Sequence, residues 1–566
     1  MPLDQKYSSE KNLKYRLLNP FQVGVGILTL VGLVIRFWKM DHGLPHFFYS
    51  DEGIFIYQAL NMGGQGLRSH YFLHPTLYLY LLLFLDGIFI LAGMARGVFS
   101  RPSDAWKLYL TDPTVFYLIG RYTSAVLGIL TIPLIYLIGK KAFNEKVGLL
   151  GSVFLTFSLL HVQWSQLGYS DVPLTFFITL AFFFSLSALR EGGLRYFVIS
   201  GFVSGLAAST KYQGLIAFLW GPLASLLVAL KKGENPVRDL GGKRNLSFLV
   251  FFVLGFTLGT PFWFLEFGQF ISHLSWLWTN LKTSGAGQLG YEGNWNWIYY
   301  LTKTFPYGLG VPVEISGILG LILLAIRFKK ESLFFISFPT IYFFLIGLSR
   351  IRVSKYLLPV FPFLCLSAAF FIVMVVSQIT GKETKGTRLV LCLTGLLVVL
   401  PSLANTFRYA YLRTSPDTRE LAYAWVREHV SPKSKVLQGS YTQIPQLPSG
   451  PWIKRLDAGL LNQRAGNRSA LKPLNHYQKE GFEYLILDEW HLGIALEEAA
   501  REAGRRKTVE RYQNFFRELK KSATLLISFS PYRNENVPFD MENVELTSRS
   551  LWKMKSTGPT VWVYKL

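Results

Sequence analysis

Residues 169–190 read YSDVPLTFFITLAFFFSLSALR, an apolar run with an acid, Asp171, near its start and a base, Arg190, at its end. A run of roughly 17–25 apolar residues is long enough to cross a bilayer as a helix. Because such runs recur as far as residue 406, the chain is predicted to be a polytopic α-helical membrane protein with about eleven spans. The predicted spans are 21–38, 115–138, 147–165, 172–189, 196–210, 212–230, 246–264, 307–326, 333–348, 356–377 and 388–406.

The composition excludes an ordinary soluble protein. Half of the 566 residues are hydrophobic and 16% are charged, with a mean hydropathy of +0.28, whereas soluble domains average about 25% charged residues. The net charge of +23 does not indicate a nucleic acid partner, because the basic residues lie in short loops between apolar runs. The two cysteines, Cys365 and Cys392, both lie inside apolar runs, which supports neither a disulfide framework nor a cysteine-based zinc site.

Charge in the loops predicts which end of each span faces the cytoplasm, because short cytoplasmic loops carry an excess of Lys and Arg. Whether the apolar run 75–94 crosses the membrane decides which of the later loops face the cytoplasm. If it does not cross, the main basic loops all lie inside, namely Lys140, Lys141 and Lys146; Arg190 and Arg195; Lys231, Lys232, Arg238, Lys243 and Arg244; Arg327, Lys329 and Lys330; and Lys382, Lys385 and Arg388. If it crosses, they all face outward, against the rule. We therefore predict that 75–94 is an interfacial or re-entrant helix on the outer face, although Arg96, Arg101 and Lys107 then also lie outside.

The first span follows four basic residues, is longer than the roughly 7–15-residue core of a signal peptide and lacks a clear cleavage site. We predict that it is not cleaved and that its N-terminus lies in the cytoplasm. The same alternation places two groups of charged residues on the outer face, the acids Asp51, Glu52 and Asp171 and the bases Lys211, Arg350, Arg352 and Lys355. Carboxylates at a membrane surface cost stability and are typical of functional sites. We therefore expect an enzyme of the cytoplasmic membrane with its site on the extracytoplasmic side.

After the last predicted span the composition changes. The sequence predicts helices at Thr418–His429 and near Glu497–Leu519, and strands at Lys435–Leu437, Tyr484–Leu487, Thr524–Ser528 and 560–564. Strands that alternate with helices are typical of a small α/β domain. We therefore divide the chain into a transmembrane catalytic domain, 1–406, and an extracytoplasmic α/β domain, 407–566.

Several short motifs follow one another on the predicted outer face. They are Ser50-Asp51-Glu52-Gly53 with Tyr57, His74-Pro75-Thr76-Leu77, Asp171-Val172-Pro173-Leu174, Gly205-Leu206-Ala207-Ala208-Ser209-Thr210-Lys211-Tyr212 and Lys355-Tyr356-Leu357-Leu358-Pro359. In this order they resemble the GT-C superfamily of polyprenyl-phosphate-sugar-dependent glycosyltransferases, of the family 39 type, and in particular its protein O-mannosyltransferase and lipid A aminoarabinose transferase branch. The C-terminal segments Asp417-Thr418-Arg419, Trp425 and Gly558-Pro559-Thr560 look like the outer domain of bacterial members. The resemblance implies the GT-C fold with juxtamembrane helices outside.

The acids have a catalytic and a structural interpretation each. Asp51 is our candidate general base, which takes the proton of the acceptor hydroxyl; alternatively, it caps a helix that begins near Ile54. Glu52 orients the acceptor, binds a metal or is structural. Asp171 completes an acidic pocket for acceptor or metal, or caps the helix that Pro173 opens. A divalent metal is thus a possible cofactor, with Glu52 and Asp171 as candidate ligands.

The bases are candidates for binding the phosphate of a lipid-linked donor, because negative charge grows on a leaving phosphate. They are Lys211, Arg350, Arg352 and Lys355, together with His74; the alternatives are contact with lipid headgroups for the bases and with local backbone for the histidine. Tyr57, Tyr212 and Tyr356 are candidate substrate contacts. Arg121 lies inside a span and is predicted to be paired structurally.

Two classes of function fit a polytopic protein with acids at its surface. The first is an inverting glycosyltransferase that moves a sugar from a polyprenyl-phosphate carrier to a protein, lipid or glycan hydroxyl outside the cytoplasm; no Walker A or dinucleotide-binding pattern is present. The second is a lipid or solute transporter or flippase. Transporters place ionisable groups near the bilayer midplane on broken helices of related halves, whereas these acids lie at span ends and no repeat is visible. We therefore favour the transferase.

Overall fold

The computed structural model describes residues 19–46, 48–283, 296–327, 329–349, 352–381, 384–439, 452–455, 471–496, 506–534, 537 and 550–566. Its larger part is a bundle of apolar helices. They are α1 (Pro20–Phe37), α5 (Thr114–Ala142), α6 (Glu145–Thr156), α7 (Leu159–Ser165), α8 (Asp171–Glu191), α9 (Leu194–Thr210), the 3₁₀ helix η2 (Tyr212–Leu219), α10 (Trp220–Lys232), α11 (Pro236–Leu240), α12 (Lys243–Gly259), α14 (Asn296–Tyr299), the π-helix η4 (Tyr300–Thr304), α15 (Phe305–Leu309), α16 (Val311–Ile326), α17 (Lys330–Gly347), the 3₁₀ helix η5 (Ser354–Val360), α18 (Phe361–Thr380) and α19 (Lys385–Leu412).

Every predicted span is helical over most of its length, because long apolar runs leave no alternative that satisfies the backbone in lipid. Eight helices in the described residues are long and apolar enough to cross a membrane, or up to ten if each bent pair forms one span. The bent pairs are α6 with α7, at 61°, and the α14–α15 segment with α16, at 119°. Two further predicted spans, 196–210 and 246–264, fall on α9 and α12, which have 17 residues each. The chain is thus a mostly helical, multi-pass membrane protein, as predicted.

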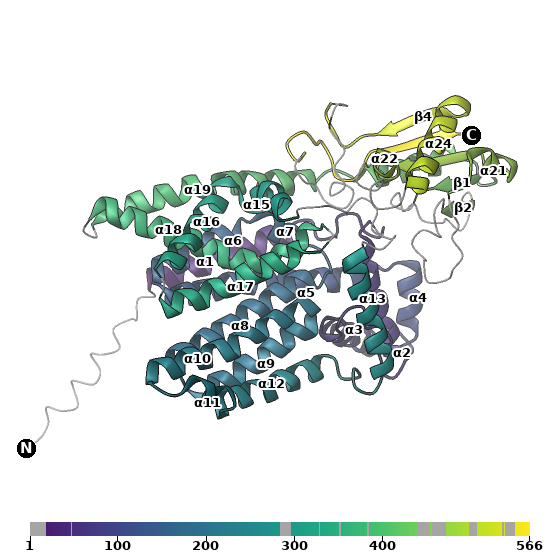
Figure 1. Ribbon diagram of the computed structural model, residues 1–566. Helices are drawn as coiled ribbons and strands as arrows, with labels where there is room; N and C mark the ends of the chain where they lie inside the picture. Colours follow the sequence, from purple (N-terminus) through teal and green to yellow (C-terminus); the bar gives the residue numbers. More distant parts are fainter. Residues whose placement is uncertain are drawn as a thin grey trace, which may run out of the picture.

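The bundle has two distinct ends. In Figure 1 the long helices run side by side, with the α10–α11–α12 connection and the facing ends of α18 and α19 at the left. At the right lie α2 (Ser50–Gly64), α3 (Leu77–Ala95), α4 (Asp104–Thr111) and α13 (Phe267–Thr283), and above them the C-terminal strands. We call this the site end of the bundle. Helix α10, whose last turn carries Lys231 and Lys232, and helix α2, whose first turn carries Asp51 and Glu52, therefore lie at opposite ends.

Helix α3, which corresponds to the ambiguous run 75–94, is one of the eight span-like helices. It begins at the site end, where the Tyr78 hydroxyl donates to the carbonyl oxygen of Gly120 and the Thr76 hydroxyl donates to that of Gly259, at 3.1 and 2.8 Å. It packs on α2 and lies near α2, α4 and α13 in Figure 1. Its non-crossing position stays a prediction.

Helices α9 and α12 pack backbone to backbone. A Cβ atom at Gly205 would lie 2.1 Å from the carbonyl oxygen of Phe252, and one at Gly201 would lie 2.3 Å from that of Phe248. Small residues permit this approach, which is typical of helix pairs in membranes. The contact fixes the position of α9 and therefore of Lys211, which follows its last residue.

The C-terminal domain contains a five-stranded sheet with the order β2-β1-β3-β5-β4. Strand β1 (Lys435–Gln438) pairs in parallel with β2 (Trp452–Arg455) and β3 (Tyr484–Asp488), while β5 (Val561–Lys565) is antiparallel to β3 and to β4 (Thr524–Phe529). Of these strands, β2 was not predicted. The helices are α20 (Thr418–His429), α21 (Leu474–Lys479), α22 (Glu489–Leu496) and α24 (Arg506–Ser522).

Helices cover both faces of this sheet, because side chains alternate along each strand. Ile486 of β3 packs in a cluster with Ala422 and Val426 of α20, whereas Leu485 and Leu487 pack with residues of α21 and α24. The α/β character of this region is as predicted. Helix α24 begins at Arg506, and residues 497–505 of the helix predicted there lie outside the described part of the chain.

Candidate active site

Asp51 lies in the first turn of α2 and pairs with Lys355 of η5. Their Oδ2 and Nζ atoms are 2.9 Å apart; the lysine side chain is 7% exposed and the aspartate side chain 41%. The lysine ammonium also lies 4.4 Å from the ring centre of Tyr169 and 4.9 Å from that of Trp164. Helix α2 begins at Ser50 and its N-cap is Tyr49, so the alternative that Asp51 caps a helix beginning near Ile54 is wrong.

Asp171 and Lys211 form a second pair at the same end of the bundle. The lysine Nζ lies 2.6 Å from Oδ1 of the aspartate, and both side chains are buried. Ser170, rather than Asp171, is the N-cap of α8. Lys211 lies 4.7 Å from the ring centre of Tyr356, the residue that follows Lys355. The two pairs therefore belong to one site.

His74 lies among these four charges and interacts electrostatically with all of them. Its ring contacts that of Phe55, one turn along α2 from Asp51, at 4.9 Å between centroids. Burial and the positive charge of Lys211 lower the pKa of His74 to about 4, although Asp51 and Asp171 act in the opposite direction. The imidazole is therefore neutral at pH 7 and acts as a hydrogen-bonding group, not as a further cation.

The pKa of Asp51 is lowered, so its carboxylate is ionised at neutral pH. Burial alone would raise the pKa of this group, but the charge and hydrogen bond of Lys355, helped by His74 and Lys211, outweigh burial. An ionised carboxylate that is partly exposed beside two lysines is a suitable proton acceptor next to a site for an anion.

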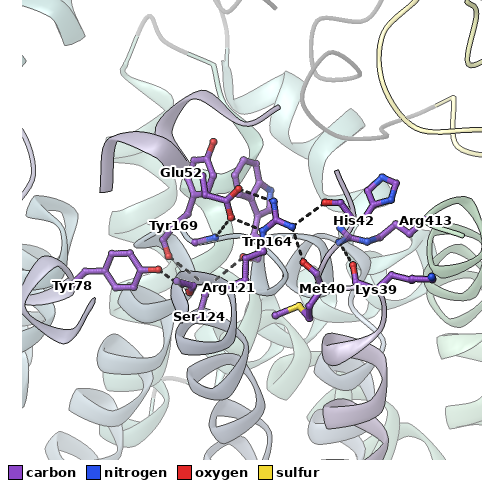
Figure 2. Close-up of polar contacts among 12 residues, drawn as sticks. Lys39, Met40, His42, Glu52, Tyr78, Arg121, Ser124, Trp164, Tyr169 and Arg413 are labelled. Atoms are coloured by element: carbon purple, nitrogen blue, oxygen red, sulfur yellow. Dashed lines mark hydrogen bonds and ion pairs between the residues drawn. The ribbon is translucent and has the colours of Figure 1, made fainter. Parts of the chain in front are cut away.

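Glu52, the neighbour of Asp51, is buried, and its carboxylate points toward Arg121 (Figure 2). Its two oxygens accept hydrogen bonds from Nε and Nη2 of Arg121, at 2.8 and 2.9 Å, and Oε1 also accepts one from the backbone N–H of Gly168, at 2.8 Å. Both side chains are 1% exposed. The structural pairing predicted for Arg121 is therefore present, and its partner is Glu52.

The predicted metal ligands each face a cation instead of one another. Glu52 is held by Arg121, and Asp171 by Lys211. Within the described residues, no group of three or more His, Cys, Asp and Glu side chains is arranged to hold a metal ion. Because these carboxylates are already neutralised, they do not fit a divalent cation, and we derive no chemical step through a metal.

Other predicted site residues contact different parts of the molecule. The Tyr57 ring packs on Trp106 of α4, the Tyr212 hydroxyl donates to the carbonyl oxygen of Phe72 at 2.8 Å, and the Arg352 guanidinium lies 4.3 Å from the ring centre of Tyr299. Arg350 lies outside the described residues. Of the three predicted tyrosines, Tyr356 is the one placed against a charged pair.

Two aromatic residues of the site were not predicted. Trp164 of α7 and Tyr169 form the wall on which the Lys355 ammonium lies, and their rings are 5.0 Å apart. Tyr169 stands two residues before Asp171 in the stretch that opens with YSD. An aromatic residue close to a surface acid in the sequence could have indicated a binding place for an ammonium group, because aromatic faces attract ammonium groups.

Comparison with known proteins bears on the family and the fold of the chain. Residues 118–256 match the family model described as dolichyl-phosphate-mannose-protein mannosyltransferase. The structure is similar to that of the oligosaccharyltransferase of Archaeoglobus fulgidus, with 12% identity, a TM-score of 0.55 and coverage of 96% of this chain and 88% of that one. ArnT of Cupriavidus metallidurans aligns over 95% of this chain and 97% of its own, with 15% identity and a TM-score of 0.48. A search of curated proteins finds no match.

The family match covers α5 to α12, which carry Arg121, Asp171 and Lys211. The likeness to the archaeal enzyme extends over nearly the whole chain and concerns the fold. The predicted resemblance to the GT-C superfamily is thus confirmed. Together, the family match and the fold indicate a glycosyltransferase of the GT-C type.

Proposed function

We propose that this protein is an inverting glycosyltransferase that moves a sugar from a polyprenyl-phosphate carrier to a hydroxyl group on the outer face of the membrane. One observation carries the proposal: a partly exposed carboxylate, Asp51, lies beside Lys355 in a site that also contains Lys211 and neutral His74. A base and two cations are the groups that this displacement needs.

Asp51 acts as the general base. The acceptor hydroxyl must lose its proton as its oxygen attacks the anomeric carbon, and a carboxylate within hydrogen-bonding reach accepts that proton. Single displacement inverts the anomeric centre, because the attacking and leaving oxygens lie on opposite faces of the sugar. The lowered pKa of Asp51 keeps it in the required ionised form.

Lys211 and Lys355 bind the phosphate that leaves. The anomeric C–O bond breaks, the electron pair stays on the phosphate oxygen, and the growing charge is stabilised by ammonium groups that are already in place. His74 donates a hydrogen bond to a phosphate oxygen in its neutral form. Each lysine is neutralised by a carboxylate in the free protein, so the phosphate competes with Asp51 and Asp171 for the same cations.

The nature of the donor is supported by the matched family, whose description names a dolichyl-phosphate-linked sugar. Structures of the archaeal enzyme include one tethered to an acceptor peptide, which supports a protein among the acceptors we consider. We assign residues 1–406 to the catalytic domain and 407–566 to an extracytoplasmic domain. The acceptor is a hydroxyl of a protein, a lipid or a glycan.

The decisive experiment uses the purified protein in nanodiscs with a polyprenyl-phosphate donor that carries a radiolabelled sugar. The expected products are free polyprenyl phosphate and a labelled acceptor from an extract of the cell envelope. Movement of the intact labelled lipid across a proteoliposome membrane, without release of polyprenyl phosphate, would replace the transferase by a flippase.

Sidedness is tested by cysteine labelling in intact cells. Cys392 is exposed and Cys365 is buried, so the background is first reduced by Cys392→Ser. In that protein an impermeant maleimide should modify Lys433→Cys, in the C-terminal domain, and should modify Lys231→Cys, at the end of α10, only after permeabilisation. The reverse pattern would place the site in the cytoplasm.

A further inference from the structure

The segment that leads to Asp51 is held mainly through its backbone. We call residues 38–49 the first outer loop; all of them except residue 47 are described. Its carbonyl oxygens accept hydrogen bonds from three buried arginines, Arg121, Arg413 and Arg419, of which Figure 2 shows the first two. Arg121 of α5 donates to Met40 and His42, at 2.7 and 2.9 Å. This arginine belongs to the bundle; the other two belong to the C-terminal part of the chain.

The first of these two is Arg413, directly after α19. Its Nη2 donates to the carbonyl oxygen of Lys39 at 2.6 Å and its Nη1 donates to the Tyr409 hydroxyl at 3.0 Å. Beside it, the Trp38 indole N–H donates to the carbonyl oxygen of Ala410, at 3.1 Å. The beginning of the loop is therefore fixed by the end of α19.

The second is Arg419 of α20, which holds the end of the loop. Its Nη1 donates to the carbonyl oxygen of Phe48 at 3.1 Å, and its guanidinium lies 4.0 Å from the centre of the Phe48 ring. Nε and Nη2 of the same side chain donate to the two oxygens of Asp417, at 2.7 and 3.0 Å. Phe48 is three residues before Asp51.

A third connection joins the middle of the loop to the C-terminal domain. The His42 Nε2 lies 2.8 Å from the Thr557 hydroxyl, which donates to Oδ2 of Asp417 at 3.0 Å. Burial, with the charge of Arg413, lowers the pKa of His42 to about 3, so this ring is neutral. His42, Thr557, Asp417, Arg419 and Phe48 thus form one continuous polar chain from loop to domain and back.

The hydrogen bonds of Asp417 and Arg419 are directional, and burying these two charged side chains costs free energy. The Asp417 and Arg419 side chains are at most 1% exposed, and taking two charges out of water costs about as much as their attraction returns. An apolar pair would fill this place with no loss of stability on average. The ion pair instead provides a fixed donor for the Phe48 carbonyl oxygen, which an apolar pair cannot provide.

We propose that the C-terminal domain positions Asp51 for catalysis by holding the first outer loop through Arg413, Arg419 and Thr557. The inference rests on the proposed function, in which Asp51 is the base. The three are positioning residues, since they contact the loop and not the substrate. The domain therefore contributes to the rate of transfer, independently of acceptor binding.

The test is Arg419→Lys, which keeps the charge opposite Asp417 but cannot bond to Asp417 and Phe48 together. We expect kcat to fall about tenfold to a hundredfold, because a misplacement of about 1 Å at a reacting group costs up to about 10²-fold. KM for the lipid-linked donor should stay within about twofold, because both lysines are untouched. Amide hydrogen exchange of residues 38–49 should become faster. The matched control is Arg427→Lys, on the exposed face of the same helix, with parent values throughout.

Thr557→Val is the second variant, because it removes one hydroxyl and retains the shape of the side chain. It should lower kcat and make amide exchange in the loop faster, with a modest fall in the unfolding temperature because Asp417 and His42 each lose a hydrogen bond. Parent kcat in both folded variants, or a fall in kcat with unchanged exchange in the loop, would overturn the inference. A parent protein that transfers no sugar overturns the proposed function instead, which separates the two failures.

Discussion

Asp51 and Glu52 are neighbours in sequence, yet they lie in two regions of opposite character. Asp51 is partly exposed and makes one contact with a lysine, Lys355. Glu52 is buried, and both of its oxygens are held by the fork of Arg121. An ammonium is a point charge on a flexible stem, whereas a guanidinium binds a carboxylate in two places at a fixed angle.

The difference separates exchangeable from permanent ion pairs. A lysine can leave its carboxylate for a phosphate, because the ammonium has no preferred direction. The buried arginines use their remaining N–H groups on backbone oxygens, so a change of partner would leave several buried groups without hydrogen bonds. The site thus combines cations that can accept a ligand with cations that fix the surrounding chain.

The largest effect is expected at the exchangeable pair. Asp51→Asn retains the size of the side chain but cannot accept a proton at neutral pH. We expect sugar transfer to fall by at least about 100-fold, with the unfolding temperature and donor binding of the parent. Single-turnover assays with labelled donor measure the loss. The control is Asp41→Asn, an exposed acid of the first outer loop. Transfer within a few-fold of the parent rate would remove Asp51 as the base and leave Asp171 as the candidate.

The permanent pair should respond in stability. Arg121→Met leaves Glu52 buried and unpaired, which costs about 3–5 kcal/mol in unfolding free energy. Thermal unfolding in detergent, followed by tryptophan fluorescence, measures the change. Arg195→Met is the matched control, since that arginine is 74% exposed and should leave the unfolding temperature unchanged. Equal stability of the two variants would contradict the division into exchangeable and permanent pairs.

The two lysines should both affect donor use but differ in their effect on stability. Lys355→Ala should leave stability nearly intact, because its partner Asp51 is 41% exposed. Lys211→Ala should also lower stability, because it leaves the buried carboxylate of Asp171 without its cation. Lys211→Ala or Lys355→Ala should weaken donor binding by about 10–150-fold. This factor corresponds to the loss of about 1.5–3 kcal/mol, the usual contribution of a hydrogen bond to a charged group. Titration of the protein with donor in nanodiscs checks this value. Lys107→Ala removes an exposed lysine and should bind donor normally. Full affinity in both site variants would place the phosphate elsewhere.

The smallest effect is that of pH. The pKa of Asp51 is lowered, so its carboxylate is ionised at any pH above the ordinary pKa range of an aspartate. The pKa of His74 is about 4, so its imidazole is neutral above that pH. Between about pH 5.5 and 8, kcat/KM for the donor should therefore vary by less than about twofold. An ordinary histidine changes charge near pH 6.5. A midpoint close to that value would show that His74 titrates as if it were exposed.

The sequence predicted the positions of the helices and strands better than the contacts that individual side chains make. Apolar length fixes where helices such as α8 run, because lipid permits no other backbone arrangement, and composition indicated the change to an α/β domain. The sequence could not show that Glu52, and not Asp51, faces Arg121, because this depends on the rotation of α2 in the assembled bundle. It also could not show the role of Arg419. The partner of this arginine in the first outer loop is a backbone oxygen, which every residue type has.

The polar chain between the first outer loop and the C-terminal domain has a consequence for biogenesis. His42 and its partner Thr557 are 515 residues apart, so a ribosome completes the loop long before it makes the groups that hold it. During this interval the spans can insert, but the carbonyl oxygens of Lys39 and Phe48 lack their final donors. Asp51, the proposed base, therefore reaches its final position late in synthesis, and a nascent chain interrupted before α20 would lack Arg419 and Thr557, which hold the first outer loop.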